Sequence, residues 1–356
     1  MDEFKILVIN PGSTSTKVAV FKNEKALLEE NLTHQHEELR QFSRIWDQLE
    51  YRQKAVEAFL QRHGLQPLAF QAIVGRGGLF RPLKGGTYRV NAAMLADAEK
   101  GLQGEHAANL GCALAWRLAQ GNIPAFVVDP VSVDEFESLA RYSGHPLLKR
   151  KSLSHALNIH TVARWVAEKL TIPYKKSQFV VAHLGGGISI AAVKGGRIID
   201  VNDALSAGPF SPNRTGTLPL QGFISLCFSG KYSEDQIRQM VAKEGGLIAY
   251  LGTADAKEIE QRIKSGDRRA EEVSEAMAYQ IAKEIGAMAT VLKGNLDAII
   301  LTGGLARWTR LVNWISERVG FIAPVQVLPG EFEMEAMALG ALRVLRGEEI
   351  ARDYGK

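Results

Sequence analysis

The chain has 356 residues, of which 46% are hydrophobic and 23% are charged. These proportions are typical of a soluble globular protein and exclude a disordered, collagen-like or disulfide-stapled chain. The 43 Lys and Arg residues outnumber the 39 Asp and Glu residues by only 4, and no long block carries one sign. We therefore expect neither a nucleic-acid partner nor a membrane partner, whereas a local cationic pocket for a small anion stays open.

The N-terminal segment and the cysteines bear on the cellular compartment. The first apolar run, Ile6–Ile9, follows an acidic start and is too short for a signal peptide. Cys112 and Cys227 lack C-x-x-C spacing and lie in apolar, helix-like segments, which favours structural thiols over a redox pair. We expect a cytoplasmic protein.

The first half of the chain alternates strand and helix patterns. The β-branched run Lys5–Ile9 predicts a buried strand, and Thr16–Phe21 predicts its hairpin partner after a Gly/Ser/Thr turn. The further predicted elements are a helix over Leu39–Gly64, a strand over Ala72–Val74 entering the loop Gly75–Gly78, a helix over Glu105–Gln120 and a strand over Pro124–Val128.

The second half repeats this opening. The segment Phe179–Val193 has the layout of Lys5–Val20, so that Asn10 corresponds to His183 and Gly12 to Gly185. A third strand ends at glycines over Asp297–Gly304. The other predicted elements are helices over His155–Leu170 and Arg268–Leu292 and a strand over Ile198–Val201. These patterns predict an internally duplicated α/β protein with mixed sheets and a ligand cleft between its halves.

The three glycine turns indicate phosphate binding. Glycine permits positive φ and lets backbone N–H groups approach an anion closely. Any one of these turns, taken alone, is equally well a tight hairpin, but three of them at the ends of apolar strands suit a polyphosphate. The sequence lacks a P-loop, a complete Rossmann fingerprint, the protein-kinase motifs and a G-x-S-x-G elbow.

Four segments, in chain order, resemble those of one family. Asn10–Lys17 resembles the N-x-G-S-x-S-x-K signature of acetate and butyrate kinases, and Ala182–Ser189 resembles their H-L-G-x-G-x-S signature. Asn213–Gly216 is similar to their T-R-S-G segment, and Thr302–Gly304 to their T-A-G adenosine turn. The resemblance covers essentially the whole chain and is greatest to the butyrate kinases. It implies two RNase-H-like lobes of the actin, Hsp70 and sugar-kinase superfamily, with an ATP cleft between them.

The same resemblance implies roles for particular residues. Arg214 would contact the transferred phosphoryl group, Arg76 the carboxylate and phosphoryl site, and Asp129 the magnesium ion or its water. A planar guanidinium suits carboxylate and phosphate oxygens. The expected catalytic residues are Arg76, Asp129, Lys151, His155 and Arg214. Asn10 and Glu333 are expected at Mg²⁺. The expected ATP-binding residues are Asn10, Gly12, Ser13, Ser15, Lys17, His183, Gly185, Gly187, Asp255, Gly303 and Gly304.

Each of these positions also has a purely structural reading. Arginines on glycine loops are often solvated, and Asp129 before Pro130 is a common turn pairing. Glu333 lies between Glu331 and Glu335 at an expected helix start, where acidic residues favour the dipole. The choice among these three glutamates stays open.

Three departures from the family pattern matter. The F-H-G-T-S-H segment is Arg150–His155 here, so Lys151 replaces the first histidine and is expected to substitute for it electrostatically. The S-D-F-R segment becomes Ala254–Lys257, and G-I-G-E-N becomes Gly304–Trp308. Gly77 and Gly78 stand where acetate kinases carry two valines, and the lost bulk is expected to make room for a longer acyl tail.

We therefore expect a butyrate kinase that uses ATP and Mg²⁺ and accepts butyrate or a branched relative such as isobutyrate. The alternatives are an acetate or propionate kinase and, in a different class, a non-catalytic Hsp70- or actin-like ATP-binding module. The expected lobes are residues 1–150 with 335–356 on the acyl and phosphate side, and residues 151–334 on the nucleotide side. The resemblance also implies a homodimer or a higher homo-oligomer.

Overall fold

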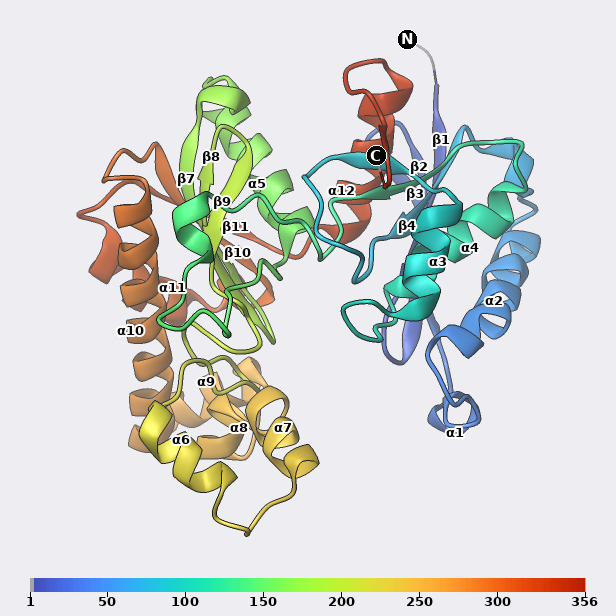
Figure 1. Cartoon of the computed structure of the whole chain (residues 1–356). Helices are drawn as coiled ribbons and strands as arrows, with labels where there is room; N and C mark the ends of the chain where they lie inside the picture. Colours follow the sequence, from blue (N-terminus) through green and yellow to red (C-terminus); the bar gives the residue numbers. More distant parts are fainter. Residues whose placement is uncertain (1–2, 356) are drawn as a thin grey trace. The chain divides into compact units, whose positions relative to one another are not determined.

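The computed structural model describes residues 3–355, which form two compact units (Figure 1). One unit contains the described residues up to Asp134 together with those from Phe332 onward, and the other is Glu135–Glu331. These limits differ from the expected lobe boundaries at residues 150 and 334. Residues 135–150 belong to the second unit because hydrogen bonds tie them to its sheet, as from Ile198 N to Glu135 Oε2 at 3.0 Å and from Glu137 N to Ile199 O at 3.0 Å.

The first unit is built on a seven-stranded mixed sheet. Its strands are β1 (Lys5–Pro11), β2 (Ser15–Lys22), β3 (Lys25–Thr33), β4 (Ala72–Arg76), β5 (Thr87–Arg89), β6 (Ala125–Val128) and β12 (Arg352–Asp353). They follow the order β12-β5-β6-β4-β1-β2-β3. Its helices are α1 (His36–Leu39), α2 (Leu49–Arg62), α3 (Ala92–Lys100), α4 (Asn109–Ala119) and α12 (Glu333–Leu345). Within this unit α12 covers one face of the sheet and α4 the other (Figure 1), so the central strands are apolar on both faces.

The second unit has a five-stranded sheet. Its strands are β7 (Gln178–Leu184), β8 (Ile188–Lys194), β9 (Arg197–Val201), β10 (Ala298–Gly303) and β11 (Val325–Pro329). Its helices are α5 (Ala156–Lys169), α6 (Leu220–Cys227), α7 (Glu234–Ala242), α8 (Gly246–Leu251), α9 (Ala256–Lys264), α10 (Arg268–Val291) and α11 (Thr309–Val319). The long helix α10 packs on β7 and β8, and α5 packs on β7 and β10 (Figure 1).

The two sheets share one topology, which confirms the predicted duplication. The order β3-β2-β1-β4-β6 in the first sheet matches β9-β8-β7-β10-β11 in the second. The strand directions match as well, since β1 and β7 each pair with an antiparallel hairpin strand on one side and a parallel strand on the other. The fold is α/β with two mixed sheets, as expected.

One predicted helix begins too early, and four strands, β3, β5, β11 and β12, were not predicted. The predicted helix Leu39–Gly64 is α2, which begins only at Leu49; before it lie α1 and a 3₁₀ turn, Trp46–Gln48. Strand β3 was missing from the sequence prediction because it is the exposed edge strand of its sheet and carries Glu and Asn, which are poor β-formers. Among residues 3–355, no helix combines the length and hydropathy needed to cross a bilayer.

Candidate active site

Three of the expected catalytic and metal-site residues lie near one edge of the first sheet. Strands β1, β4 and β6 run parallel, so their carboxyl ends meet at the same edge. Asn10 is near the end of β1, Arg76 ends β4, and Asp129 directly follows β6. The parallel pairing therefore brings residues from three separate segments together.

Glu333 joins Asn10 and Arg76. It is the first residue of α12, and its Oε2 accepts a 2.7 Å hydrogen bond from Asn10 Nδ2. Its Oε1 lies 3.1 Å from Arg76 Nη2. The Arg76 side chain is buried, and its other terminal nitrogen, Nη1, has no hydrogen-bond partner among the described residues. A buried guanidinium with an unused donor is an arrangement that an anionic ligand would complete.

Asp129 is held by the backbone. Its Oδ1 accepts a 2.7 Å hydrogen bond from Gly86 N, and its side chain is buried. Its φ of 38° is left-handed, which is uncommon for a residue other than glycine and marks a constrained position.

The first glycine turn links β1 to β2. Gly12 N donates to Ser15 O at 2.8 Å, Ser13 is exposed and Ser15 is half-buried. Lys17 stands opposite Asn10 in the hairpin register, so both side chains share one face of the sheet.

The expected reason for these glycines needs correction. Of Gly12, Gly185, Gly187, Gly303 and Gly304, only Gly303 has a positive φ, at 89°. A Cβ atom on Gly303 would also stand 2.3 Å from Leu184 O. For Gly187 the requirement is space, because a Cβ atom there would lie 2.4 Å from Arg214 Nη1.

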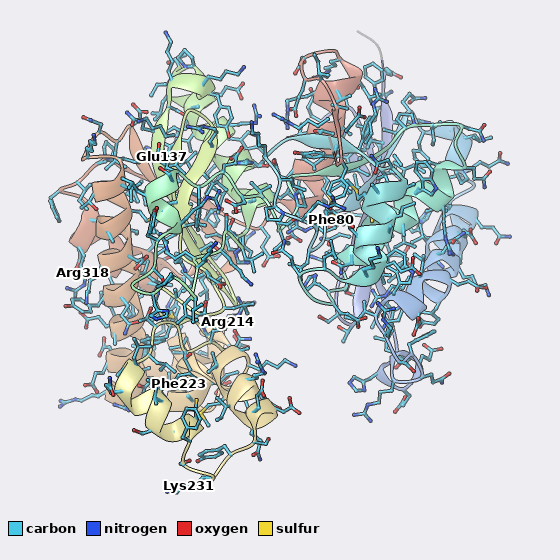
Figure 2. The ribbon with its side chains drawn as sticks, in the orientation of Figure 1. Phe80, Glu137, Arg214, Phe223, Lys231 and Arg318 are labelled. Carbon is cyan, nitrogen blue, oxygen red and sulfur yellow. The ribbon has the colours of Figure 1, made fainter. Side chains whose placement is uncertain are left out.

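Arg214 rests against the second glycine turn. Its Nη1 donates to Ala204 O at 3.0 Å, while its Nε is buried without a partner in the described part of the chain. Burial lowers the pKa of Arg214, and the nearby Asp203 opposes this shift. Figure 2 labels Arg214 within the second unit, below the sheet. Like Arg76, Arg214 combines a desolvated guanidinium with an unused donor.

Two expected histidines form a stack in the second unit. The rings of His155 and His183 lie 3.9 Å apart between centroids, with an angle of 12° between their planes. His155 Nδ1 is 2.9 Å from Ser189 Oγ, and His183 Nδ1 is 2.8 Å from Asn158 Oδ1. The sequence reasoning did not identify Asn158, although its position in the first turn of α5, three residues after the N-cap residue His155, was a usable signal.

Lys151 lies on the surface of the segment that leads to His155. Its side chain is exposed, whereas the preceding Arg150 is anchored by a two-bond contact to Asp200, with distances of 2.7 and 3.2 Å. The structure therefore fixes the segment through Arg150 and leaves the Lys151 side chain exposed to solvent.

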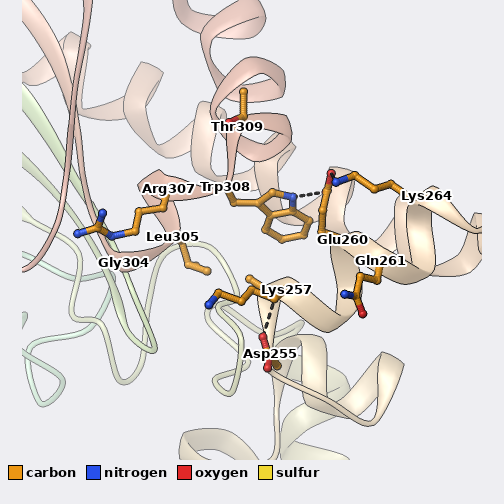
Figure 3. Close-up of a pocket in the computed structure, with 11 residues that line it drawn as sticks. Asp255, Lys257, Glu260, Gln261, Lys264, Gly304, Leu305, Arg307, Trp308 and Thr309 are labelled. Carbon is orange, nitrogen blue, oxygen red and sulfur yellow. Dashed lines mark hydrogen bonds and ion pairs between the residues drawn. The ribbon is translucent and has the colours of Figure 1, made fainter.

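A pocket of about 700 Å³ lies beside the third glycine turn (Figure 3). It is lined by Gly304, Leu305 and Arg307 from that turn, by Trp308, and by residues of α9. Trp308 Nε1 donates to Glu260, which fixes the indole ring at the pocket wall (Figure 3). Asp255 lines the pocket and also caps α9, since its Oδ1 accepts a 2.8 Å hydrogen bond from Lys257 N.

The expected acyl space at Gly77 and Gly78 is filled. A Cβ atom on Gly77 would stand 2.4 Å from Pro130 Cβ, and one on Gly78 would stand 2.7 Å from Asn109 Cα. These glycines admit neighbouring backbone and side chains, so the inference that they open room for a longer acyl tail is wrong.

Two sequence comparisons identify the family. A family model described as the acetokinase family matches residues 141–318. Over 353 residues, 99% of this chain and all of the other, the sequence is 51% identical to a protein named probable butyrate kinase 2, from Caldanaerobacter subterraneus subsp. tengcongensis.

The solved structures that share the fold include two kinases. An acetate kinase from Porphyromonas gingivalis matches with a TM-score of 0.80 at 20% identity, covering 96% of this chain and 100% of that one. A propionate kinase from Francisella tularensis matches with a TM-score of 0.77 at 20% identity, covering 95% and 98%. The family resemblance of the motifs is confirmed, and the chain belongs to the acetokinase family.

Proposed function

We propose that this protein is a butyrate kinase. It transfers the terminal phosphoryl group of ATP to the carboxylate of butyrate, or of a short branched acid such as isobutyrate, and it also runs in reverse. The observation that carries the proposal is the buried Arg76 guanidinium, which bonds Glu333 through one terminal nitrogen and leaves the other unused. The full-length relative named a probable butyrate kinase supports this choice of acid.

The chemistry asks mainly for charge neutralisation and positioning. A carboxylate oxygen attacks the γ-phosphorus while the bond to the β-phosphate oxygen breaks, so that ADP leaves with the electron pair. The nucleophile is already ionised and needs no strong base, but two anions must meet. Arg76 would orient the carboxylate, and Arg214 would stabilise charge on the transferred phosphoryl group. The exposed Lys151 would add a donor to phosphoryl oxygens.

The residues present fit Mg²⁺ bound together with nucleotide. Mg²⁺ is usually held by one or two carboxylates plus substrate phosphates, without a dedicated protein cage. Among residues 3–355, no group of three or more His, Cys, Asp or Glu side chains forms such a cage. Glu333 supplies a carboxylate, and the Asn10 amide nitrogen that donates to it leaves the amide oxygen for a cation. The ion would neutralise phosphate charge, and Asp129 would orient one of its waters.

We assign the first unit to the acid and phosphates and the second to the nucleotide. The pocket beside Trp308 would hold the adenosine, with Asp255 and Gly304 at its wall and Gly303 next to Gly304 in the same turn. The first turn, with Gly12, Ser13, Ser15 and Lys17, would bind phosphate oxygens, as would His183, Gly185 and Gly187 in the second, and His155 would support His183 through their stack. We expect the enzyme to act in the cytoplasm, as a homodimer or higher homo-oligomer.

One experiment distinguishes the proposed butyrate kinase from two alternative functions. An acetate or propionate kinase would share the whole site, whereas a non-catalytic ATP-binding module has no use for Arg76. The test is ATP-dependent hydroxamate formation with unbranched acids of two to five carbons and with isobutyrate. Butyrate or isobutyrate should give the highest kcat/KM. A preference for acetate or propionate would select the first alternative, and ATP binding without product from any acid would select the second.

A further inference from the structure

Arg52 is a buried arginine on α2 whose hydrogen-bond partners are all uncharged. The residue is 1% exposed. Nη1 donates to Ser15 O at 3.0 Å and to Thr16 Oγ1 at 3.1 Å, and Nη2 donates to Ser13 O at 3.2 Å. Nε and Nη2 also donate to Gln48 Oε1, at 3.0 and 2.9 Å.

This charge is not neutralised within the described part of the chain. A buried ion is costly unless it is paired, and Arg76 in the same unit does have a carboxylate partner in Glu333. Desolvation lowers the pKa of Arg52 to about 10, so the group stays protonated at neutral pH. The negative charge that neutralises Arg52 must therefore come from a bound anionic ligand.

The contacts of Arg52 also orient the first glycine turn. Its guanidinium draws the carbonyl oxygens of Ser13 and Ser15 towards α2. Carbonyl oxygens carry partial negative charge, so turning them inward removes groups that would repel an anion. On the outer side of the turn, Ser13 and Thr14 are exposed. The exposed residues Ser13 and Thr14 therefore lie on the outer side of the turn, and the positively charged Arg52 guanidinium lies on its inner side.

We propose that Arg52 is a positioning residue for nucleotide phosphate, acting through the Ser13–Ser15 turn. The proposal rests on the proposed function, because it takes this turn as phosphate-binding. Arg52 holds the carbonyl oxygens of Ser13 and Ser15 away from the bound phosphate. The phosphate in turn supplies the negative charge that no carboxylate among residues 3–355 provides for Arg52.

The test compares Arg52→Gln and Arg52→Lys with a matched control on the same helix, Arg62→Gln. Arg62 is exposed and pairs with Glu30 at 2.7 Å, away from the turn. For Arg52→Gln we expect the KM for ATP to rise roughly tenfold or more while the KM for butyrate stays within about twofold. Arg52→Lys keeps the charge and should recover part of the loss. Arg62→Gln should match the wild type.

Calorimetric binding of ATP, ADP and AMP gives a second readout that does not need turnover. Arg52→Gln should weaken ATP binding more than AMP binding, because the lost charge acts on phosphate. If Arg52→Gln lowers the melting temperature but leaves the KM for ATP and the three affinities unchanged, Arg52 only supports the fold and the proposal is wrong. Equal weakening of all three nucleotides contradicts it too.

The test stays decisive if Arg52→Gln does not fold or if the wild type shows no kinase activity. If Arg52→Gln does not fold, Arg52→Lys must still raise the KM for ATP severalfold without changing that for butyrate, since it cannot reproduce the forked contacts; an unchanged KM refutes the proposal. If the wild type forms no hydroxamate with any acid, the proposed function fails, while the calorimetric comparison still decides the role of Arg52.

Discussion

Asn10 donates a 2.7 Å hydrogen bond to Glu333, although 323 positions separate the two residues in the chain. The bond joins the first strand to the last long helix, which packs on the sheet of the first unit. Because Glu333 also contacts Arg76, one carboxylate links a metal-site candidate to a substrate-site candidate. This favours Glu333 over Glu331 and Glu335 as the acidic residue that serves the metal.

Replacing Glu333 should therefore damage metal-dependent catalysis. For Glu333→Gln we expect kcat to fall on the order of 100-fold and the Mg²⁺ concentration for half-maximal rate to rise, since a charged oxygen is lost. Glu335→Gln, in the same first turn of α12, is the control and should stay near wild type. Magnesium titrations of the initial rate measure both. If only Glu335→Gln lowers kcat, Glu335 and not Glu333 is the residue that serves the metal.

Arg76 should matter for the acid more than for the nucleotide. Lysine cannot reproduce a forked guanidinium that bonds Glu333 through one nitrogen and a ligand through the other. We expect Arg76→Lys to reduce kcat/KM for butyrate on the order of 100-fold, with a much smaller change in the KM for ATP. Arg89→Lys, at an exposed position on β5, is the matched control. Equal losses for both substrates would argue against carboxylate binding by Arg76.

The fit of Arg214 against Gly187 gives a test that needs no change of charge. A Cβ atom at Gly187 would lie 2.4 Å from Arg214 Nη1, so Gly187→Ala must displace the guanidinium. Because the clash involves the end of a flexible side chain, the protein should fold, while kcat should fall roughly 10- to 100-fold. At Gly186 the nearest atom to an added Cβ is 3.7 Å away, so Gly186→Ala serves as control. Steady-state kinetics of the two variants measure this effect. Equal kcat values for Gly187→Ala and Gly186→Ala would show that Arg214 takes no part in the reaction.

Gly78→Ala should cost stability and leave substrate choice alone. The new Cβ atom would stand 2.7 Å from Asn109 Cα, a contact that backbone cannot relieve cheaply. We expect the free energy of unfolding to drop by about 2 kcal/mol or more. Gly144→Ala, where no atom lies within 4 Å of an added Cβ, should be neutral. Urea denaturation measures the stability, and rates with acetate and butyrate should keep their ratio; a changed ratio would restore the acyl-pocket interpretation.

His34 predicts a pH dependence of stability. It is buried, its Nε2 lies 2.8 Å from Thr16 Oγ1, and burial followed by the charge of Arg52 lowers the pKa of His34 from 6.5 to about 4. Between pH 6.5 and pH 4, the unfolded chain binds a proton at His34 more readily than the folded protein does. The stability that neutral His34 contributes is therefore fully present above pH 6.5 and is lost as the pH falls towards 4. The loss should reach about 3 kcal/mol.

The measurement is urea denaturation of the wild type and His34→Gln at pH 7 and pH 5. The variant should lose less stability than the wild type between these values. His63→Gln, a partly exposed histidine of the same unit, is the control and should behave as the wild type does. Identical pH dependence in wild type and His34→Gln would contradict the prediction.

Local sequence was sufficient for the central strands of both sheets and for the family. Apolar runs such as Ile6–Ile9 and Val180–Ala182 have the composition of strands covered on both faces, and the structure places them at the centres of the two sheets. The repeated turn at Asn10 and His183 predicted the duplication because the signal is carried by contiguous residues. The edge strand β3 and the start of α2 lacked such a signal, since exposed or irregular segments leave little apolar periodicity.

Contacts between distant segments were decided only by the tertiary structure. The glycines at 77 and 78 indicated empty space, but Pro130 and Asn109 occupy it, and only folding brings those residues there. Arg52 is one of several charged residues in the sequence of α2, and its burial behind the first turn depends on how that helix packs. The residue types and their order along each strand are local properties of the chain, whereas burial and the pairing of charges depend on which elements lie next to one another.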